Sequence, residues 1–199
     1  SPMPDVSAVD LDEMMNKAVH PTVEELRKRG IDYRGVLFAG FMITADGPKL
    51  LEFNVRFGDP EAQVILPRFE GDLAETLFQV ANGDLRIRPT LSNDAMVAVV
   101  LASQGYPTAP KTGDVICGLE QAKEIEGVNV FCAGVASNSR DELVTGGGRV
   151  LNVCGRAAKL EAARELAYKA VSFISWPGMQ HRTDIGASIG IAPGKEEVT

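Results

Sequence analysis

The stretch LLEFNVRFGDPEAQVILP, residues 50–67, joins an apolar strand pattern to a row of three polar residues. Side chains alternate between the two faces of a strand, so Glu52, Asn54 and Arg56 are expected on one face, about 6.6 Å apart. Glutamate and asparagine offer hard oxygen ligands for Mg²⁺, and arginine offers a planar donor fork for a phosphate or carboxylate. A hairpin also carries polar residues on its outer face for solubility alone, so the pattern by itself leaves both interpretations open.

Composition excludes several classes of protein. A net charge of −7 argues against a nucleic-acid backbone as the main partner, because phosphate binding needs an excess of lysine and arginine. The three cysteines (Cys117, Cys132 and Cys154) lack the spacing of a zinc site and are odd in number, which suits thiols in a reducing compartment. No apolar run is long enough to cross a bilayer and no signal peptide opens the sequence, so we expect a cytoplasmic protein without a membrane partner.

The first part of the chain has the pattern of helices around a hairpin. The expected elements are helices over 8–29, 59–67 and 72–83 and strands over 35–43 and 49–57. The dipeptide Asp-Gly at 46–47, between two apolar runs, favours an antiparallel hairpin. Asp59 and Pro60 have the residue types of an N-cap and a first helical residue, as Asp72 does for the next helix. Pro21 either kinks the first helix or starts a second one.

The second part of the chain is richer in strands. The expected elements are strands over 95–103, 111–119, 129–137 and 147–155, followed by one amphipathic helix over 157–174. The boundary between two α+β units is expected within 84–94. The predicted fold class is therefore α+β, with an antiparallel sheet and helices first and a small mixed β domain with one long helix after it.

Beyond local patterns, EFNVRFGDPE at 52–61 closely resembles the EFN-x-RFGDPE signature of the glycinamide ribonucleotide synthetases, a family of ATP-grasp ligases. Further segments resemble this family in the same order: SPMP at 1–4, YRGVLFAG at 33–40, GYP at 105–107, TGDVICGL at 112–119, GGRVLNV at 147–153 and RTDIG at 182–186. Several ordered motifs are more specific than any one of them. The resemblance covers residues 1–186.

The resemblance implies a division into domains. Residues 1–90 would be the C-terminal part of an ATP-grasp domain, 91–188 the family's C-terminal domain, and 189–199 a flexible tail. The family's N-terminal domain and lid domain would precede Ser1, so the chain is expected to be a fragment that is inactive alone. The missing N-terminal half of the same enzyme is then a possible partner.

The resemblance also implies an activity. The family joins glycine to 5-phosphoribosylamine at the expense of ATP, through an acyl-phosphate intermediate, in purine biosynthesis. The implied cofactors are ATP with Mg²⁺ or Mn²⁺, and the implied partners are these small-molecule substrates. Two alternatives stay open: another ATP-grasp carboxylate–amine ligase, and a non-catalytic fragment or binding module. Magnesium-dependent nucleotide binding would argue against the module.

Seven residues receive roles from this resemblance. The implied roles are metal binding for Glu52 and Asn54, catalysis at the transferred phosphoryl group for Arg56, nucleotide binding for Met42 and Phe53, and substrate binding for Asp59 and Glu61. As a methionine in a strand, Met42 is more often simply a core residue than part of a nucleotide site. Asp59 and Glu61 have a structural alternative as helix-capping acids, which is compatible with a place in the substrate pocket.

Overall fold

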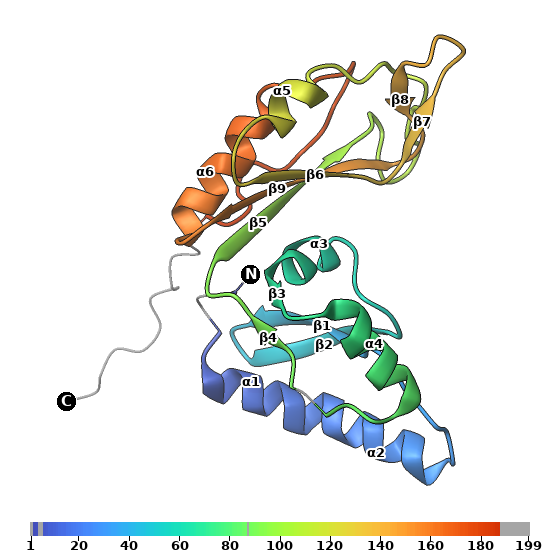
Figure 1. Ribbon diagram of the computed structural model, residues 1–199, viewed down its shortest axis with the longest axis vertical. Helices are drawn as coiled ribbons and strands as arrows, with labels where there is room; N and C mark the ends of the chain where they lie inside the picture. Colours follow the sequence, from blue (N-terminus) through green and yellow to red (C-terminus); the bar gives the residue numbers. More distant parts are fainter. Residues whose placement is uncertain (1, 4–5, 87, 188–199) are drawn as a thin grey trace, which may run out of the picture. The chain divides into compact units, whose positions relative to one another are not determined.

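The computed structural model describes residues 2–3, 6–86 and 88–187, which divide between Asn93 and Asp94 into an N-terminal unit and a C-terminal unit. Figure 1 labels the elements of both units. The flexible tail expected over 189–199 lies outside the described residues. Within the described ranges, every helix is too short or too polar to cross a membrane.

A continuous helical stretch opens the N-terminal unit and consists of α1 (Ala8–Met14), the π-helical turn η1 (Met15–Val19) and α2 (His20–Lys28). The Ser7 hydroxyl accepts the Asp10 N–H at 3.1 Å, and the Asp10 carboxylate accepts the Ser7 N–H at 2.9 Å, which forms a capping box. Pro21, which has no N–H, is the second residue of α2, so it lies at the start of a second α-helical segment. Gly30 follows the helix in the left-handed region, at φ +72°.

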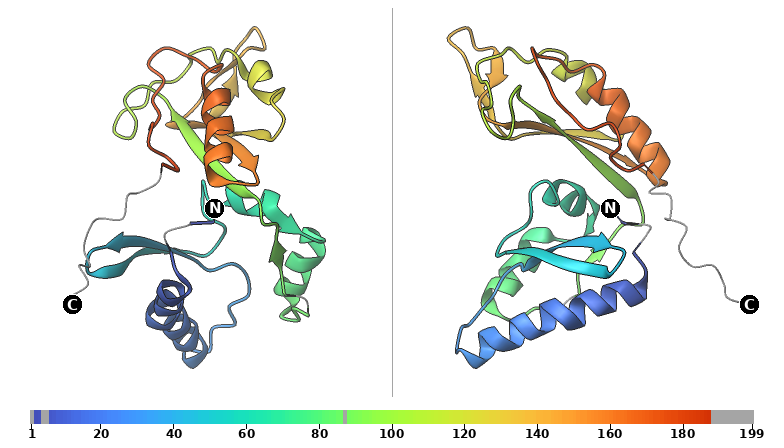
Figure 2. Two further views of the ribbon diagram at one scale, coloured as in Figure 1. Left: turned by 90° about the vertical axis from the view of Figure 1, so that its left-hand side faces the viewer. Right: turned by 180° about the vertical axis from the view of Figure 1, so that it is seen from behind.

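The predicted hairpin is confirmed, and α1 and α2 run along one side of it (Figure 2). Its strands are β1 (Phe38–Thr44) and β2 (Gly47–Asn54). The register shifts at Gly40, which pairs with Glu52, whereas the next residue of β1 pairs with Leu50. Leu51 is therefore the extra residue of a β-bulge, and β2 ends at Asn54, before the expected end at 57.

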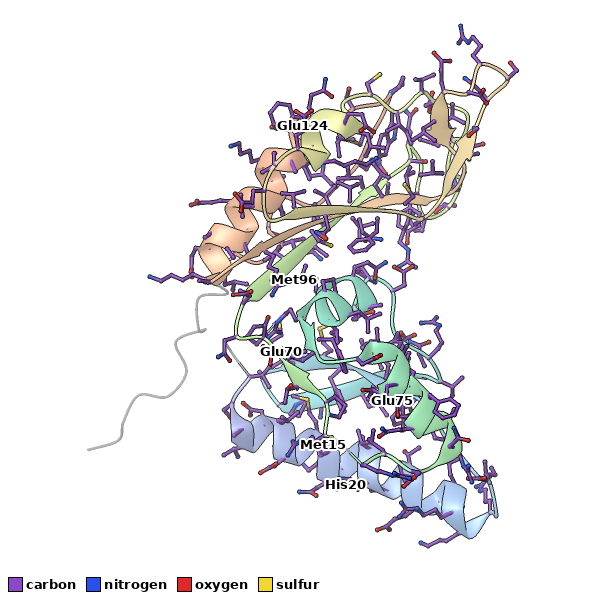
Figure 3. The ribbon with its side chains drawn as sticks, in the orientation of Figure 1. Met15, His20, Glu70, Glu75, Met96 and Glu124 are labelled. Atoms are coloured by element: carbon purple, nitrogen blue, oxygen red, sulfur yellow. The ribbon has the colours of Figure 1, made fainter. Side chains whose placement is uncertain are left out.

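The rest of the N-terminal unit consists of short elements and one longer helix. They are α3 (Ala62–Ile65), the 3₁₀ turn η2 (Leu66–Arg68), β3 (Phe69–Glu70), α4 (Leu73–Asn82) and β4 (Thr90–Leu91), with β3 and β4 paired antiparallel. The prediction for α4 is confirmed, because Asp72 Oδ1 accepts the Glu75 N–H at 2.9 Å and Gly83 ends the helix at φ +70°. Figure 3 shows Glu75 in the first turn of α4.

The predicted cap of α3 is wrong. Glu61 is the N-cap of α3, and Asp59 and Pro60 lie in the turn before it. The Asp59 carboxylate accepts the side-chain amide of Gln63 at 2.9 Å, while the N–H of Ala62 bonds to the carbonyl of Gly58 at 3.0 Å. The helix therefore starts from a backbone turn that the dipeptide Asp-Pro did not indicate.

The C-terminal unit is built on a three-stranded antiparallel sheet in the order β5-β9-β6. The strands are β5 (Ala95–Ala102), β6 (Val128–Cys132) and β9 (Arg149–Ala157), and the helices α5 (Leu119–Lys123) and α6 (Leu160–Val171) lie on one face of this sheet (Figure 1). The layer between helices and sheet is a closed apolar core that includes Val99, Leu101, Leu151, Val153 and Ala167, each at 0% exposure. A separate two-stranded sheet pairs β7 (Val135–Ser137) with β8 (Leu143–Thr145).

Two strand predictions in this unit need correction. The run 111–119 forms no continuous strand: Val115 makes an isolated antiparallel bridge with Val144, and Cys117 makes one with Ser175. Since each bridge stands alone, no ladder of consecutive pairs develops. The run 129–137 is interrupted at Gly134 and contributes β6 and β7 to two different sheets. The coarse prediction of a mixed α and β fold with antiparallel sheets is confirmed.

Candidate active site

The end of β2 brings two oxygen-bearing side chains together. The Asn54 amide donates to Glu52 Oε1 at 3.0 Å, so the two side chains share one face of the hairpin. Gly40 lies across the hairpin from Glu52, and a Cβ at Gly40 would be 3.3 Å from Glu52 Cγ. Because Gly40 has no side chain, the side chain of Glu52 has room directly beside its strand partner.

A groove of about 830 Å³ opens between α1 and the hairpin. Glu52 and Glu61 both line it, although one belongs to β2 and the other caps α3. The remaining lining is mainly apolar and includes Met3, Leu11, Met14, Phe41, Ile43 and Leu51. The groove therefore brings together one carboxylate that was predicted to bind metal and one that was predicted to bind substrate.

Arg56 lies outside the strand that was expected to carry it. Residues 55–56 form a bend after β2, and Arg56 Nη1 donates to the carbonyl of Phe57 at 2.9 Å. The predicted row of three polar side chains on one strand face is therefore reduced to Glu52 and Asn54. A guanidinium has five N–H donors, so this single bond leaves room for an anion.

The two residues predicted to bind the nucleotide lie on different strands of the hairpin. Phe53 pairs with Ala39 and lies between Glu52 and Asn54 along β2, so its side chain points to the opposite face from theirs. Met42 pairs with Lys49, beyond the register shift at Gly40, and is 53% exposed.

The donor set at the end of β2 fits a magnesium-like ion held partly by phosphates. Within the ranges that the structure describes, no group of three or more His, Cys, Asp and Glu side chains could hold a metal by itself. Mg²⁺ is commonly bound through one or two carboxylates together with substrate phosphates and water. Glu52 and Asn54, which are within hydrogen-bond distance of each other, could supply the protein ligands of such an ion.

Sequence reasoning missed the contribution of α1 to the groove. Ser7 and Leu11 both line it, beside residues of the hairpin. The Ser-x-x-Asp pattern at 7–10 was a signal for the start of this helix, since it is a capping-box sequence. The bulge at Leu51 had no comparable signal in the sequence.

Comparison with protein families gives two matches in chain order. Residues 1–62 match the family model for "Phosphoribosylglycinamide synthetase, ATP-grasp (A) domain", and residues 96–188 match "Phosphoribosylglycinamide synthetase, C domain". The first match contains Glu52, Asn54, Arg56 and Glu61, so the groove belongs to the region similar to the A domain.

Curated relatives include two named phosphoribosylamine–glycine ligase. The chain is 45% identical to the chloroplastic protein of Arabidopsis thaliana, over 94% of this chain and 36% of the relative. It is 44% identical to the protein of Streptomyces coelicolor, over 94% of this chain and 46% of the relative. The chain thus spans less than half the length of these relatives.

Solved structures support the same relationship. A phosphoribosylamine–glycine ligase from Thermotoga maritima aligns with a TM-score of 0.73 and 33% identity, over 92% of this chain and 44% of that chain. An N5-carboxyaminoimidazole ribonucleotide synthetase from the same organism, at 16% identity and a TM-score of 0.50, shares the fold alone. Because the A-domain and C-domain models match in order and together take in most of the chain, the chain belongs to the phosphoribosylglycinamide synthetase family.

Proposed function

We propose that this chain supplies the metal-binding and substrate-binding part of a phosphoribosylamine–glycine ligase, which joins glycine to 5-phosphoribosylamine at the expense of ATP. The observation that carries the proposal is that Glu52, which accepts a hydrogen bond from the Asn54 amide, lines a groove together with Glu61. Its location within the match to the ATP-grasp domain supports the assignment. The names of the curated relatives support the choice of substrates.

In this proposal, Glu52 and Asn54 would hold a divalent cation, Mg²⁺ or Mn²⁺, together with the phosphates of ATP. A divalent cation there would neutralise charge on the phosphates, which is the main requirement of phosphoryl transfer. The glycine carboxylate attacks the γ-phosphoryl group and releases ADP. The amine of 5-phosphoribosylamine then attacks the carbonyl carbon, displaces phosphate and loses a proton as the amide forms. Arg56 stabilises the charge that spreads over the transferred group.

The remaining predicted residues receive binding roles. Glu61 lines the groove, and the carboxylate of Asp59 is held by Gln63, so both can present oxygens to substrate amine or hydroxyl groups. Met42 would form an apolar wall for adenine. Phe53 lies on the face opposite the proposed metal ligands, so its contribution to nucleotide binding would be through its backbone or through the packing of β2.

We assign residues 1–90 to the ATP-grasp domain and 91–188 to the family's C domain. The preceding part of the same enzyme is the proposed partner of the N-terminal unit. Leu51 is 64% exposed and Phe78 is 65% exposed, and a two-stranded sheet is marginally stable by itself. Additional chain that covers these apolar side chains would complete the domain.

Cytoplasm stays our predicted location, although one relative is named chloroplastic.

The direct test uses the chain joined to the additional length that its relatives possess. We expect release of ADP that requires glycine, 5-phosphoribosylamine and a divalent cation together. ADP release with a different acid, and none with glycine, would support the rival carboxylate–amine ligase. The 199-residue chain alone should form no glycinamide ribonucleotide in the same assay. Absence of magnesium-dependent nucleotide binding by the longer protein would favour the non-catalytic alternative.

A further inference from the structure

We infer that Gly58 is a positioning residue: the absence of its side chain creates the space that the Glu61 carboxylate occupies at the groove. This inference rests on the proposed role of Glu61 in substrate binding. Gly58 is buried, directly before the turn that leads into α3. Its φ lies outside the left-handed region, so its backbone conformation does not by itself require glycine.

The contact between the two residues is unusually close. A Cβ built on Gly58 would be 2.2 Å from Glu61 Oε2, 2.9 Å from Glu61 Cδ and 3.3 Å from Glu61 Cβ. Normal carbon–oxygen contacts are about 3.3 Å or longer, so the Glu61 carboxylate fills the volume that any side chain at 58 would need.

Backbone bonds hold both residues in place, so the side chain of Glu61 is the part that can yield. The Gly58 carbonyl accepts the N–H of Ala62 at 3.0 Å. The Glu61 carbonyl accepts the N–H groups of Val64 and Ile65, both at 3.1 Å. A methyl group at 58 would therefore rotate the flexible glutamate away before it displaced the turn.

Displacement of Glu61 would change the chemistry of the groove. Glu52 and Glu61 together give an apolar-lined groove two negative charges, which suit an amine, a hydroxyl cluster or a metal-bound ligand. If Glu61 rotates away, the groove keeps its volume and Glu52 but loses one recognition group. The expected consequence is weaker substrate binding with an intact fold.

The kinetic test is a double-mutant cycle in the whole ligase. Glu61→Gln should raise the KM for glycine or for 5-phosphoribosylamine, and Gly58→Ala should raise the same KM about tenfold, with a smaller effect on kcat. The KM of the double variant should be no higher than that of the more impaired single variant, because both changes remove the same contact. Gly147→Ala is the matched control, since Gly147 also lacks a left-handed φ and should leave both KM values unchanged.

Melting curves separate positioning from folding. Gly58→Ala should melt within about 2–4 °C of the parent, the range for a change of about 0.5 kcal/mol. Effects of Gly58→Ala and Glu61→Gln that multiply in the double variant, or a Gly58→Ala effect on kcat alone, would overturn the inference.

A structure of the 199-residue Gly58→Ala variant gives a readout that does not depend on activity. We expect the Glu61 carboxylate in a different rotamer, away from residue 58, with α3 unchanged. An unmoved carboxylate would overturn the positioning role even if activity fell. If Glu61→Gln leaves both KM values unchanged, the proposed substrate role of Glu61 fails and the link from Gly58 to binding fails with it. In that case, a Glu61 carboxylate that moves away in the Gly58→Ala crystal would establish the steric contact with residue 58 but would give it no role in substrate binding.

Discussion

A methyl group at Gly155 should severely destabilise the C-terminal unit. Gly155 lies in β9 on the face that packs against α6. A Cβ at this position would be 2.1 Å from the carbonyl oxygen of Ala163 and 2.6 Å from the backbone nitrogen of Ala167. These neighbours belong to the helix backbone, so no side-chain rotation can relieve the overlap.

The size of the effect follows from the distances. Since normal carbon–oxygen contacts are about 3.3 Å, the helix would have to move away from the sheet by about 1 Å. Such a shift would loosen Ala163, Ala167 and Ala170, which are all at 0% exposure. Overpacking typically costs about 1–3 kcal/mol, and backbone neighbours place Gly155→Ala at the upper end. A loss of about 3 kcal/mol corresponds to a melting temperature lower by about 12–24 °C in a unit of this size.

Trp176 provides the assay. It is the single tryptophan of the sequence and is 6% exposed in the core of the C-terminal unit, so its fluorescence reports the unfolding of that unit. Urea titrations of the parent and of Gly155→Ala, at a matched protein concentration, give the difference in the free energy of unfolding.

Gly147→Ala serves as the control for this experiment too. A Cβ at Gly147 would lie 3.3 Å from the Cα of Gly134, a tight contact but a much longer one than those at Gly155, so we expect a smaller loss of about 1 kcal/mol. A Gly155→Ala variant that unfolds within about 0.5 kcal/mol of the parent, with an unchanged slope, would refute the close approach of α6 to β9.

Three further predictions concern charged groups and thiols. Glu52→Gln in the whole ligase should lower kcat about 100- to 1,000-fold through the loss of an anionic metal ligand, measured over a series of Mg²⁺ concentrations; normal turnover with a lower melting temperature would make Glu52 structural. Arg56→Lys keeps the charge but loses the planar fork, so turnover should fall by a similar factor of about 100–1,000 while ATP affinity changes less; steady-state turnover within twofold of the parent would remove Arg56 from the site. Burial raises the pKa of Cys154 to about 12, so a thiol reagent at pH 8 should modify exposed Cys117 and Cys132 and spare Cys154 until the protein unfolds; three fast thiols in the folded protein would contradict this.

Local sequence determined the elements whose signals lie within one short segment. The cap at Asp72 and the left-handed Gly83 specify α4 because both groups bond to the backbone of the same helix. The hairpin around 46–47 was equally readable, since the turn and both strands lie within one stretch of sequence. The motif at 52–61 pointed to the family without any knowledge of the fold.

The composition of the groove needed the tertiary structure. Glu52 and Glu61 are separated along the chain, and their approach to one cavity depends on how α1 packs beside the hairpin. The bulge at Leu51 and the early end of β2 separate Arg56 from the strand face that an uninterrupted alternation would have assigned to it. Alternation predicts faces correctly only while the register continues.

In the run 111–119 the sequence likewise determined one property, burial, and the tertiary structure decided another, the absence of a strand. Its apolar residues were a correct sign of burial, because Ile116 and Leu119 are 8% and 6% exposed. Its pattern was nevertheless wrong as a sign of a strand, since Val115 and Cys117 make isolated bridges to Val144 and Ser175 and no run of consecutive pairs forms. Burial is a property that a residue's own chemistry favours, and the sequence determined it. A strand also needs a continuous partner, which is supplied from elsewhere in the chain, and only the tertiary structure decided whether one was there.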